Sequence, residues 1–238
     1  MRQLCKWLPG IFLAMMFTGC NKPVSVLLVT GGHAFDTVEF LEVFDEMNGI
    51  VYDQAWHPEA LELLGTAAID DYDVLVFYDF MVDLPESDSS VYRALTEAGK
   101  PMLLMHHALC NFQRWDGYME MAGGRYVMAG YEPDSTLHSG YRHDIDLDVK
   151  VVDRKHPVTL AMEDFTIHDE GYSNIRILPG VTPLLTTDHP DCAPLVGWTH
   201  TRDRSTVVYL MLGHDRYAYE HQAFRQLARQ SILWLAGD

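Results

Sequence analysis

Basic residues are scarce in this sequence. Lysine and arginine total 17 against 34 aspartates and glutamates, which gives a formal net charge of −17 with histidine neutral. No basic stripe or patch interrupts this acidic composition, and a surface of such charge repels the phosphate backbone of nucleic acids. We therefore expect no nucleic acid among the partners of this protein.

Cysteine is also rare, and several catalytic motifs are missing. The chain has 4 cysteines, of which Cys110 and Cys192 lie outside the N-terminal segment. Two cysteines make no disulfide framework, so we expect buried free thiols, with a single bridge between them left open. The sequence lacks the GxSxG nucleophile elbow and the HExxH zinc motif, and Gly123-Gly124 has neither the spacing nor the lysine of a phosphate loop. Because Cys110 lies four positions after His106 without flanking glycines, a thiol amidotransferase mechanism is not expected.

The N-terminal segment is typical of an export signal. Arg2 and Lys6 precede an apolar run from Trp7 to Phe17. The following Thr18-Gly19-Cys20 completes a sequence that resembles a bacterial lipoprotein box, although Phe17 replaces the more usual leucine. We expect residues 1–19 to be removed, Cys20 to carry lipid, and residues 20–23 to tether an exported protein to a membrane. The alternatives are an ordinary cleaved signal or an uncleaved anchor, for which the apolar run is short.

From Val24 onward, apolar strands alternate with helical segments. The predicted strands of the first half are Val24–Thr30, Ile50–Trp56, Asp73–Phe80 and Pro101–Met105. Helices are predicted from Asp36 onward, at Glu59–Leu64 and at Ser87–Ala98. Strands joined by helical crossovers indicate a parallel sheet with helices on both faces.

The second half shows a different pattern. Arg142–Asp153 alternates apolar and polar residues, as a half-exposed strand does. Further segments are two short strands at Phe165–His168 and Val181–Thr186, a hairpin of Ala193–His200 with Thr206–Leu212, and a helix at Tyr219–Ala236 with Phe224, Leu227, Ile232 and Leu235 as its buried stripe. We predict one α/β domain over residues 24–238, with a doubly wound, mainly parallel sheet flanked by helices and antiparallel additions in the second half.

Histidines follow several of the predicted strands. His33 comes after the first strand, His106 and His107 after Pro101–Met105, and His214 after the last strand. A single histidine is more often a hydrogen-bonded structural residue. Ligands of open parallel sheets bind outside the carboxyl ends of the strands, where these four side chains would meet. An extended backbone would point His106 and His107 to opposite sides, and we favour His106 as the one in the pocket.

Two further groups of residues are candidates. The region after Cys110 holds Trp115, Arg125, Tyr126 and His138, whose mixture of rings and polar groups suits a sugar, although a packed surface loop would have the same composition. Asp169 and Glu170 are adjacent acids that could act as bases, ligate a metal or orient an imidazole. Composition alone indicates that these two acids are solvated.

Taken together, the motifs resemble those of the ThuA-like (trehalose utilisation) family. They are Leu28-Val29-Thr30-Gly31-Gly32-His33, Leu104-Met105-His106-His107-Ala108, Gly123-Gly124-Arg125-Tyr126, His156-Pro157, Asp169-Glu170-Gly171-Tyr172, Pro194-Leu195-Val196-Gly197-Trp198 and Leu212-Gly213-His214. The resemblance implies a fold similar to class I glutamine amidotransferases, with the His106 segment where those enzymes have their cysteine. It also implies a role in carbohydrate metabolism that involves oxidised (keto) derivatives of trehalose or other glucosides. The matching positions that the resemblance implies for a site are His33, His106, His138, Asp169, Glu170 and His214. Gly197-Trp198 departs from the Ala-Trp pair common in the family.

The sequence thus predicts an enzyme that acts on a sugar or keto-sugar by histidine and carboxylate acid–base chemistry. The sequence does not decide between isomerisation, elimination and hydrolysis of a 3-keto-glycoside. It also leaves open whether the protein forms a homo-oligomer. The predicted catalytic residues are His33, His106, Asp169, Glu170 and His214, and the predicted substrate-binding residues are His107, Trp115, Arg125, Tyr126, His138 and Trp198. The candidate cofactor is a divalent metal such as zinc on His33, His106 and His214. The alternative is a non-catalytic, membrane-anchored sugar-binding lipoprotein.

Overall fold

The computed structural model describes residues 22–83 and 88–237. The predicted export segment and the lipidated Cys20 lie outside the described residues, so both stay predictions from the sequence. Among the residues described, no helix combines the length and the apolar character that a membrane span needs.

The first half forms the parallel part of one large sheet. Its strands are β1 (Val24–Gly31), β2 (Ile50–Trp56), β3 (Val74–Asp79) and β4 (Met102–Met105). They alternate with α1 (Thr37–Asp45), α2 (Ala60–Leu64), the 3₁₀ helix η1 (Ala67–Asp71) and α3 (Ser89–Ala98). β1 pairs in parallel with both β2 and β3, and β3 pairs with β4. The strands β3 and β4 are buried along their whole length because helices cover both faces of the sheet.

The second half extends the same sheet with antiparallel strands. β11 (Ser205–Leu210) pairs in parallel with β4, and its hairpin partner β10 (Leu195–Arg202) begins the antiparallel part. β9 (Thr182–Thr187), β6 (Gly140–Val151) and β7 (Phe165–Ser173) complete the order β2-β1-β3-β4-β11-β10-β9-β6-β7. A separate small sheet joins β5 (Gly124–Arg125) to β8 (Arg176–Ile177). The predicted fold class is therefore confirmed.

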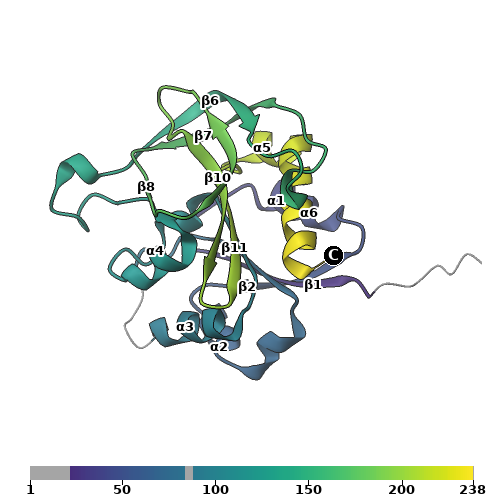
Figure 1. Ribbon diagram of the computed structural model, residues 1–238. Coiled ribbons are helices and arrows are strands. Elements are labelled where there is room, and N and C mark those ends of the chain that lie inside the picture. Colours follow the sequence, from purple (N-terminus) through teal and green to yellow (C-terminus); the bar gives the residue numbers. More distant parts are fainter. Residues whose placement is uncertain (1–21, 84–87, 238) are drawn as a thin grey trace, which may run out of the picture.

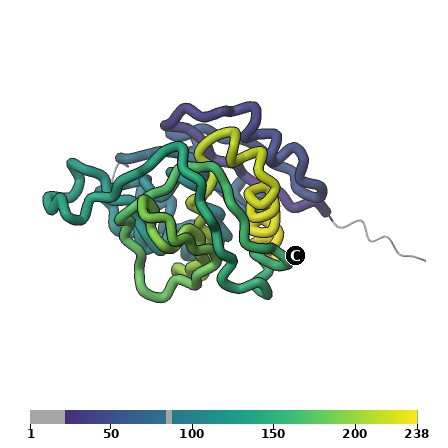
Figure 2. The backbone as a smooth tube through the Cα atoms, turned by 90° about the horizontal axis from the view of Figure 1, so that it is seen from above, coloured from purple at the N-terminus to yellow at the C-terminus, as the bar shows by residue number. Residues whose placement is uncertain are grey.

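Helices cover the two faces of the sheet. α6 (Gln222–Ala236) packs with α1 and α5 (Arg216–Glu220) on one face, and α3 with α4 (Asp116–Ala122) lies on the other (Figure 1). Seen from above, α6 lies between the N-terminal part of the chain and the green segment that follows β6 (Figure 2).

Two element boundaries differ from the sequence prediction. The single helix predicted over Tyr219–Ala236 is two helices, because the His221 ring accepts a hydrogen bond from the Ala223 N–H and starts α6 there. The predicted buried stripe from Phe224 to Leu235 is confirmed. β7 continues to Ser173, five residues beyond the predicted His168, because β6 pairs with it along this whole length. Asp169 and Glu170 consequently lie inside a strand and are buried, which corrects the solvated position indicated by their composition.

A buried acid lies at the end of β3. The Asp79 carboxylate is wholly buried, and its Oδ2 is 3.6 Å from Nε2 of His57, which follows β2. The Tyr92 hydroxyl is 2.9 Å from the same His57 nitrogen. Burial raises the pKa of Asp79 to about 7 and lowers the pKa of His57 to about 4, so both side chains are neutral in the folded protein near pH 6.

We expect the Asp79→Asn variant to be more stable than the wild type at alkaline pH. An unfolded aspartate titrates near pKa 3.9, about three units below folded Asp79, so the folded state keeps a proton that the unfolded chain releases between about pH 4 and about pH 7. Wild-type stability therefore falls with rising pH across this window, by up to about 4 kcal/mol, and asparagine removes this loss.

Urea unfolding at about pH 5 and about pH 8 measures the effect, because the gap between variant and wild type should widen with pH. His57→Asn is the matched control, since His57 is neutral across most of this range. An Asp79→Asn variant less stable than the wild type at about pH 8 would show instead that Asp79 and His57 form a stabilising ion pair.

Candidate functional site

A cavity of about 240 Å³ opens at the carboxyl ends of the parallel strands. Its walls carry five histidines, one glutamate and several aromatic rings. The histidines are His33, His106, His107, His143 and His214. The other lining residues are Phe80, Cys110, Tyr126, Met128, Tyr141, Glu170 and Tyr172.

Two parts of the sheet build this cavity. His33 follows β1, His106 follows β4, and His214 lies just beyond β11, so the ends of three parallel strands supply one wall. The antiparallel pair β6 and β7, which lies at the top of the molecule in Figure 1, adds His143 and Glu170 to the lining.

The backbone turns sharply at His106. Met105 ends β4, and His106 begins the 3₁₀ helix η3 (His106–Cys110) with a positive φ of 49°. Because the segment is no longer extended, the prediction that His106 and His107 point to opposite sides is wrong, and both line the cavity. His106 Nδ1 is 2.6 Å from the Met211 carbonyl oxygen, to which it donates. This bond leaves His106 Nε2 without a proton in the neutral ring.

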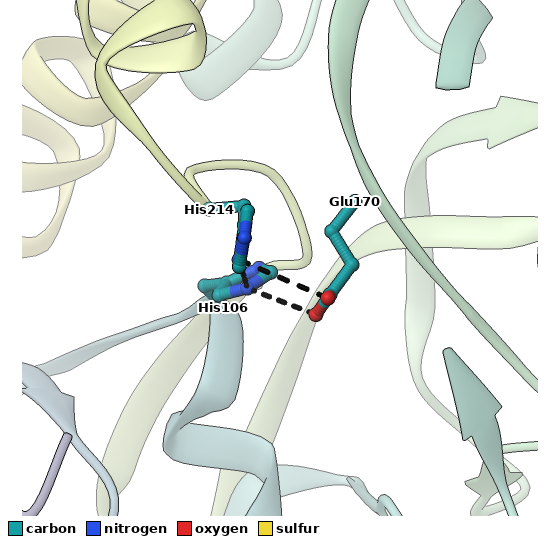
Figure 3. A group of neighbouring side chains, drawn as sticks. All are labelled: His106, Glu170 and His214. Atoms are coloured by element: carbon teal, nitrogen blue, oxygen red, sulfur yellow. Dashed lines mark hydrogen bonds and ion pairs between the residues drawn. The ribbon is translucent and has the colours of Figure 1, made fainter. Parts of the chain in front are cut away.

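His106, Glu170 and His214 form the centre of the cavity (Figure 3). His106 Nε2 is 3.4 Å from Glu170 Oε1 and 3.3 Å from His214 Nδ1. His214 Nδ1 is 3.8 Å from Glu170 Oε2. These three side chains, one donor atom from each, are close enough together to hold a metal ion.

The charges of this cluster depend on burial and on one another. Burial alone would lower the pKa of His106, but the Glu170 and Asp169 carboxylates outweigh it and raise that pKa above its ordinary value. Burial would raise the pKa of Glu170, but the neighbouring histidines keep that pKa below its usual range, so Glu170 is ionised. Burial raises the pKa of the Cys110 thiol well above its ordinary value. Cys110 and Cys192 are both buried and free, as predicted, and a protonated Cys110 is a poor nucleophile.

A β-bulge brings His143 to the site, although the sequence prediction assigned this residue neither a catalytic nor a substrate-binding role. The pairing of β6 with β7 shifts register between Arg142 and Ile145, where Asp144 has a positive φ of 54°. His143 Nδ1 lies 2.6 Å from Glu170 Oε2. The signal in the sequence is the polar run Arg142-His143-Asp144, which interrupts the apolar alternation of the strand.

Asp169 faces away from this centre and holds the His214 loop. Its Oδ1 accepts from the backbone N–H groups of Glu170 at 2.8 Å and His214 at 2.9 Å, and its Oδ2 accepts from the Gly213 N–H at 2.8 Å. Asp169 thus joins β7 to the segment after β11. We assign it as a positioning residue rather than a group that touches substrate.

The remaining predicted site residues are distributed over several places. Tyr126, His107 and His33 line the cavity, and the His33 ring packs 5.1 Å from that of His107, outside the central cluster. The other four lie outside the cavity. Trp115 lines a separate groove by α3 and α4, and Arg125 pairs with Asp116. His138 contacts the Glu132 carbonyl, and the buried Trp198 donates to the Ala122 carbonyl. Glu170, not His33, is the neighbour of His106 and His214.

Comparisons with known proteins give one family and one fold. The family model ThuA, described as trehalose utilisation, matches residues 25–235. A ThuA-like protein from Parabacteroides merdae has a similar structure, with a TM-score of 0.75, 16% identity, and 90% of each chain covered. A second ThuA-like protein, from Bacteroides uniformis, has a TM-score of 0.68 and 17% identity, with 96% of this chain and 95% of the other chain covered.

The fold also occurs as part of larger proteins. A β-galactosidase from Halorubrum lacusprofundi matches with a TM-score of 0.56 and 12% identity, over 90% of this chain but 30% of its own. A comparison with curated protein sequences gives no significant match. At these identities the structural matches establish the fold alone.

Proposed function

Because the chain belongs to the ThuA (trehalose utilisation) family, we propose that it is a carbohydrate-metabolism enzyme that moves a proton on a keto-sugar. The observation that carries the proposal is the contact of 2.6 Å between His143 Nδ1 and the buried, ionised Glu170. A carboxylate that holds one ring nitrogen of a histidine leaves the other free to take a proton. His143 is the general base of the proposal, and Glu170 orients it.

The rest of the cavity suits a sugar that carries a carbonyl group. Tyr126, Tyr172 and Phe80 offer aromatic surfaces for the C–H faces of one ring. His106 also lines the cavity, and the Glu170 and Asp169 carboxylates raise its pKa against the effect of burial. In the protonated ring, which the raised pKa favours, Nε2 can donate to a carbonyl oxygen. This donation stabilises the negative charge that forms on the oxygen when the neighbouring carbon loses its proton.

The proposed step is therefore the transfer of a proton from the carbon next to the carbonyl to His143 Nε2. The electron pair of the broken C–H bond moves into an enolate, whose oxygen His106 stabilises. Isomerisation, elimination and hydrolysis of a 3-keto-glycoside can all begin with this step. The keto group is required because it acidifies the neighbouring C–H bond. An unoxidised glucoside has no keto group, so its C–H bonds are not acidic enough for this step.

We expect the protein to exchange this proton for deuterium in 3-keto-glucosides but not in the parent glucosides. Proton NMR in D₂O measures the exchange for a panel of matched pairs, whatever the net reaction. His143→Ala should slow the exchange by about 100-fold or more, since a positioned general base contributes about 10²–10⁴-fold. His168→Ala is the control, because His168 pairs with Asp146 and does not line the cavity.

Two results would contradict the proposal. One is the absence of exchange in every keto-sugar of the panel, and the other is an equal rate in His143→Ala and the wild type. Calorimetric binding of the same sugars without exchange would identify a non-catalytic sugar-binding protein.

A further inference from the structure

The donor atoms of His106, Glu170 and His214 have the spacing of ligands around one small cation. In a tetrahedral zinc site with bonds of about 2.0–2.1 Å, neighbouring donor atoms lie about 3.3–3.4 Å apart. His106 Nε2 lies 3.3 Å from His214 Nδ1 and 3.4 Å from Glu170 Oε1. A charge-assisted hydrogen bond would bring nitrogen and carboxylate oxygen to about 2.7–2.9 Å. These two separations fit shared coordination better than direct hydrogen bonding, and the third, 3.8 Å from His214 Nδ1 to Glu170 Oε2, is also longer than a hydrogen bond.

The surroundings prepare these atoms to act as ligands. The bond from His106 Nδ1 to the Met211 carbonyl directs the lone pair of Nε2 into the cluster, as an outer contact of a metal-bound histidine does. Glu170 is held in the same way, because its Oε2 contacts His143 Nδ1 while Oε1 faces His106.

The composition of the cluster indicates the kind of cation. Imidazole nitrogen and carboxylate oxygen suit zinc, and two histidines with one glutamate leave a fourth position free in catalytic zinc sites. The Tyr172 hydroxyl lies 3.0 Å from His106 Nε2, where it can hydrogen-bond an oxygen bound at that position. Water or a substrate oxygen would fill this position.

We propose that His106 Nε2, Glu170 and His214 Nδ1 bind one zinc-class divalent cation, with its fourth position open to the substrate. The cation would polarise a carbonyl oxygen in place of His106, while His143 keeps its role as the base. The site goes beyond the proposed function and does not depend on it, because the three donor atoms alone define it.

Metal binding to the full chain tests this proposal. After removal of metal with a chelator, we expect one zinc ion per chain by elemental analysis and calorimetry. We also expect cobalt(II) to give the intense visible bands of a four-coordinate ion. Glu170→Gln and His214→Ala should each weaken zinc binding by at least about 100-fold. Loss of a residue that only supports a ligand already costs about 10–100-fold, and loss of a direct ligand should cost at least as much. Circular dichroism of the metal-free variants shows that they fold.

The control variant alters a second group of histidine and aspartate side chains, on the surface, that could also bind zinc. His168 Nδ1 lies 2.8 Å from Asp146 and its Nε2 3.7 Å from Asp144, all on exposed side chains. His168→Ala should bind zinc like the wild type. The proposal is overturned if no zinc binds, if binding survives in Glu170→Gln and His214→Ala, or if it is lost in His168→Ala. Since no sugar is present, this outcome is independent of the exchange experiment.

Discussion

Replacement of Glu170 by glutamine is expected to lower kcat on a keto-sugar by about 1,000-fold or more. The glutamine keeps the shape of the side chain but loses the negative charge that contacts His143 at 2.6 Å and faces His106. An uncharged amide neither stabilises the protonated base nor holds its tautomer, and comparable changes in carboxylate–histidine pairs cost about 10⁴-fold. Steady-state kinetics on the 3-keto-glucoside with the fastest exchange measures the loss.

The matched control is Glu163→Gln, which alters an exposed glutamate that pairs with Arg154. This variant should keep the wild-type kcat, and Glu170→Gln should still bind the sugar in calorimetry, because the aromatic walls are unchanged. A Glu170→Gln enzyme within about 10-fold of wild-type kcat would exclude Glu170 from the role assigned to it, since a positioned acid–base group contributes more.

Asp169→Ala is expected to destabilise the protein by about 3 kcal/mol or more and to reduce turnover. Alanine leaves three N–H groups without the acceptor they share, those of Glu170 and Gly213, which are buried, and that of His214, which is partly buried. Each unsatisfied buried donor costs about 1–3 kcal/mol. The loop that carries His214 would also lose its connection to β7. Urea unfolding measures the stability, and steady-state kinetics on the keto-sugar measures the turnover. Zinc affinity at the proposed site reports the position of His214.

Asp169→Asn provides an intermediate case. The side-chain oxygen of asparagine can still accept a hydrogen bond, but its NH₂ group replaces the second oxygen and faces a backbone N–H, which it cannot bind. It should lie between the wild type and Asp169→Ala in both stability and zinc affinity. The exposed Asp146→Ala, which removes a hydrogen bond to His168, is the control and should cost less than about 1 kcal/mol. A loss below about 1 kcal/mol in Asp169→Ala would show that water replaces the carboxylate and that Asp169 does not position His214.

Local patterns in the sequence predict much of the fold. Ile50–Trp56 is a strand with the predicted bounds, and α3 ends at Ala98 with Gly99 in the left-handed conformation beyond it. The placement of His33, His106 and His214 after strands is also confirmed. These features depend on the alternation of apolar residues and on glycine at helix ends, which the neighbouring residues determine.

Aromatic composition was less informative about the site. Trp115 and Trp198 were predicted to bind substrate, but the first lines another groove and the second is buried with its N–H on the Ala122 carbonyl. A ring that packs in a core and a ring that stacks on a sugar have the same sequence signal, because both need an apolar surface and one polar partner.

The sequence by itself determined the order of strands and helices and placed histidines at the ends of the parallel strands. Only the tertiary structure decided which acid joins them. β7 lies at the far edge of the sheet from β4, yet Glu170 contacts His106. Its neighbour Asp169 joins β7 to the site through the N–H groups of Gly213 and His214, which lie 44 and 45 residues further along the chain. Two adjacent acids look alike in a sequence whether they are solvated or buried, since their burial depends on segments distant along the chain.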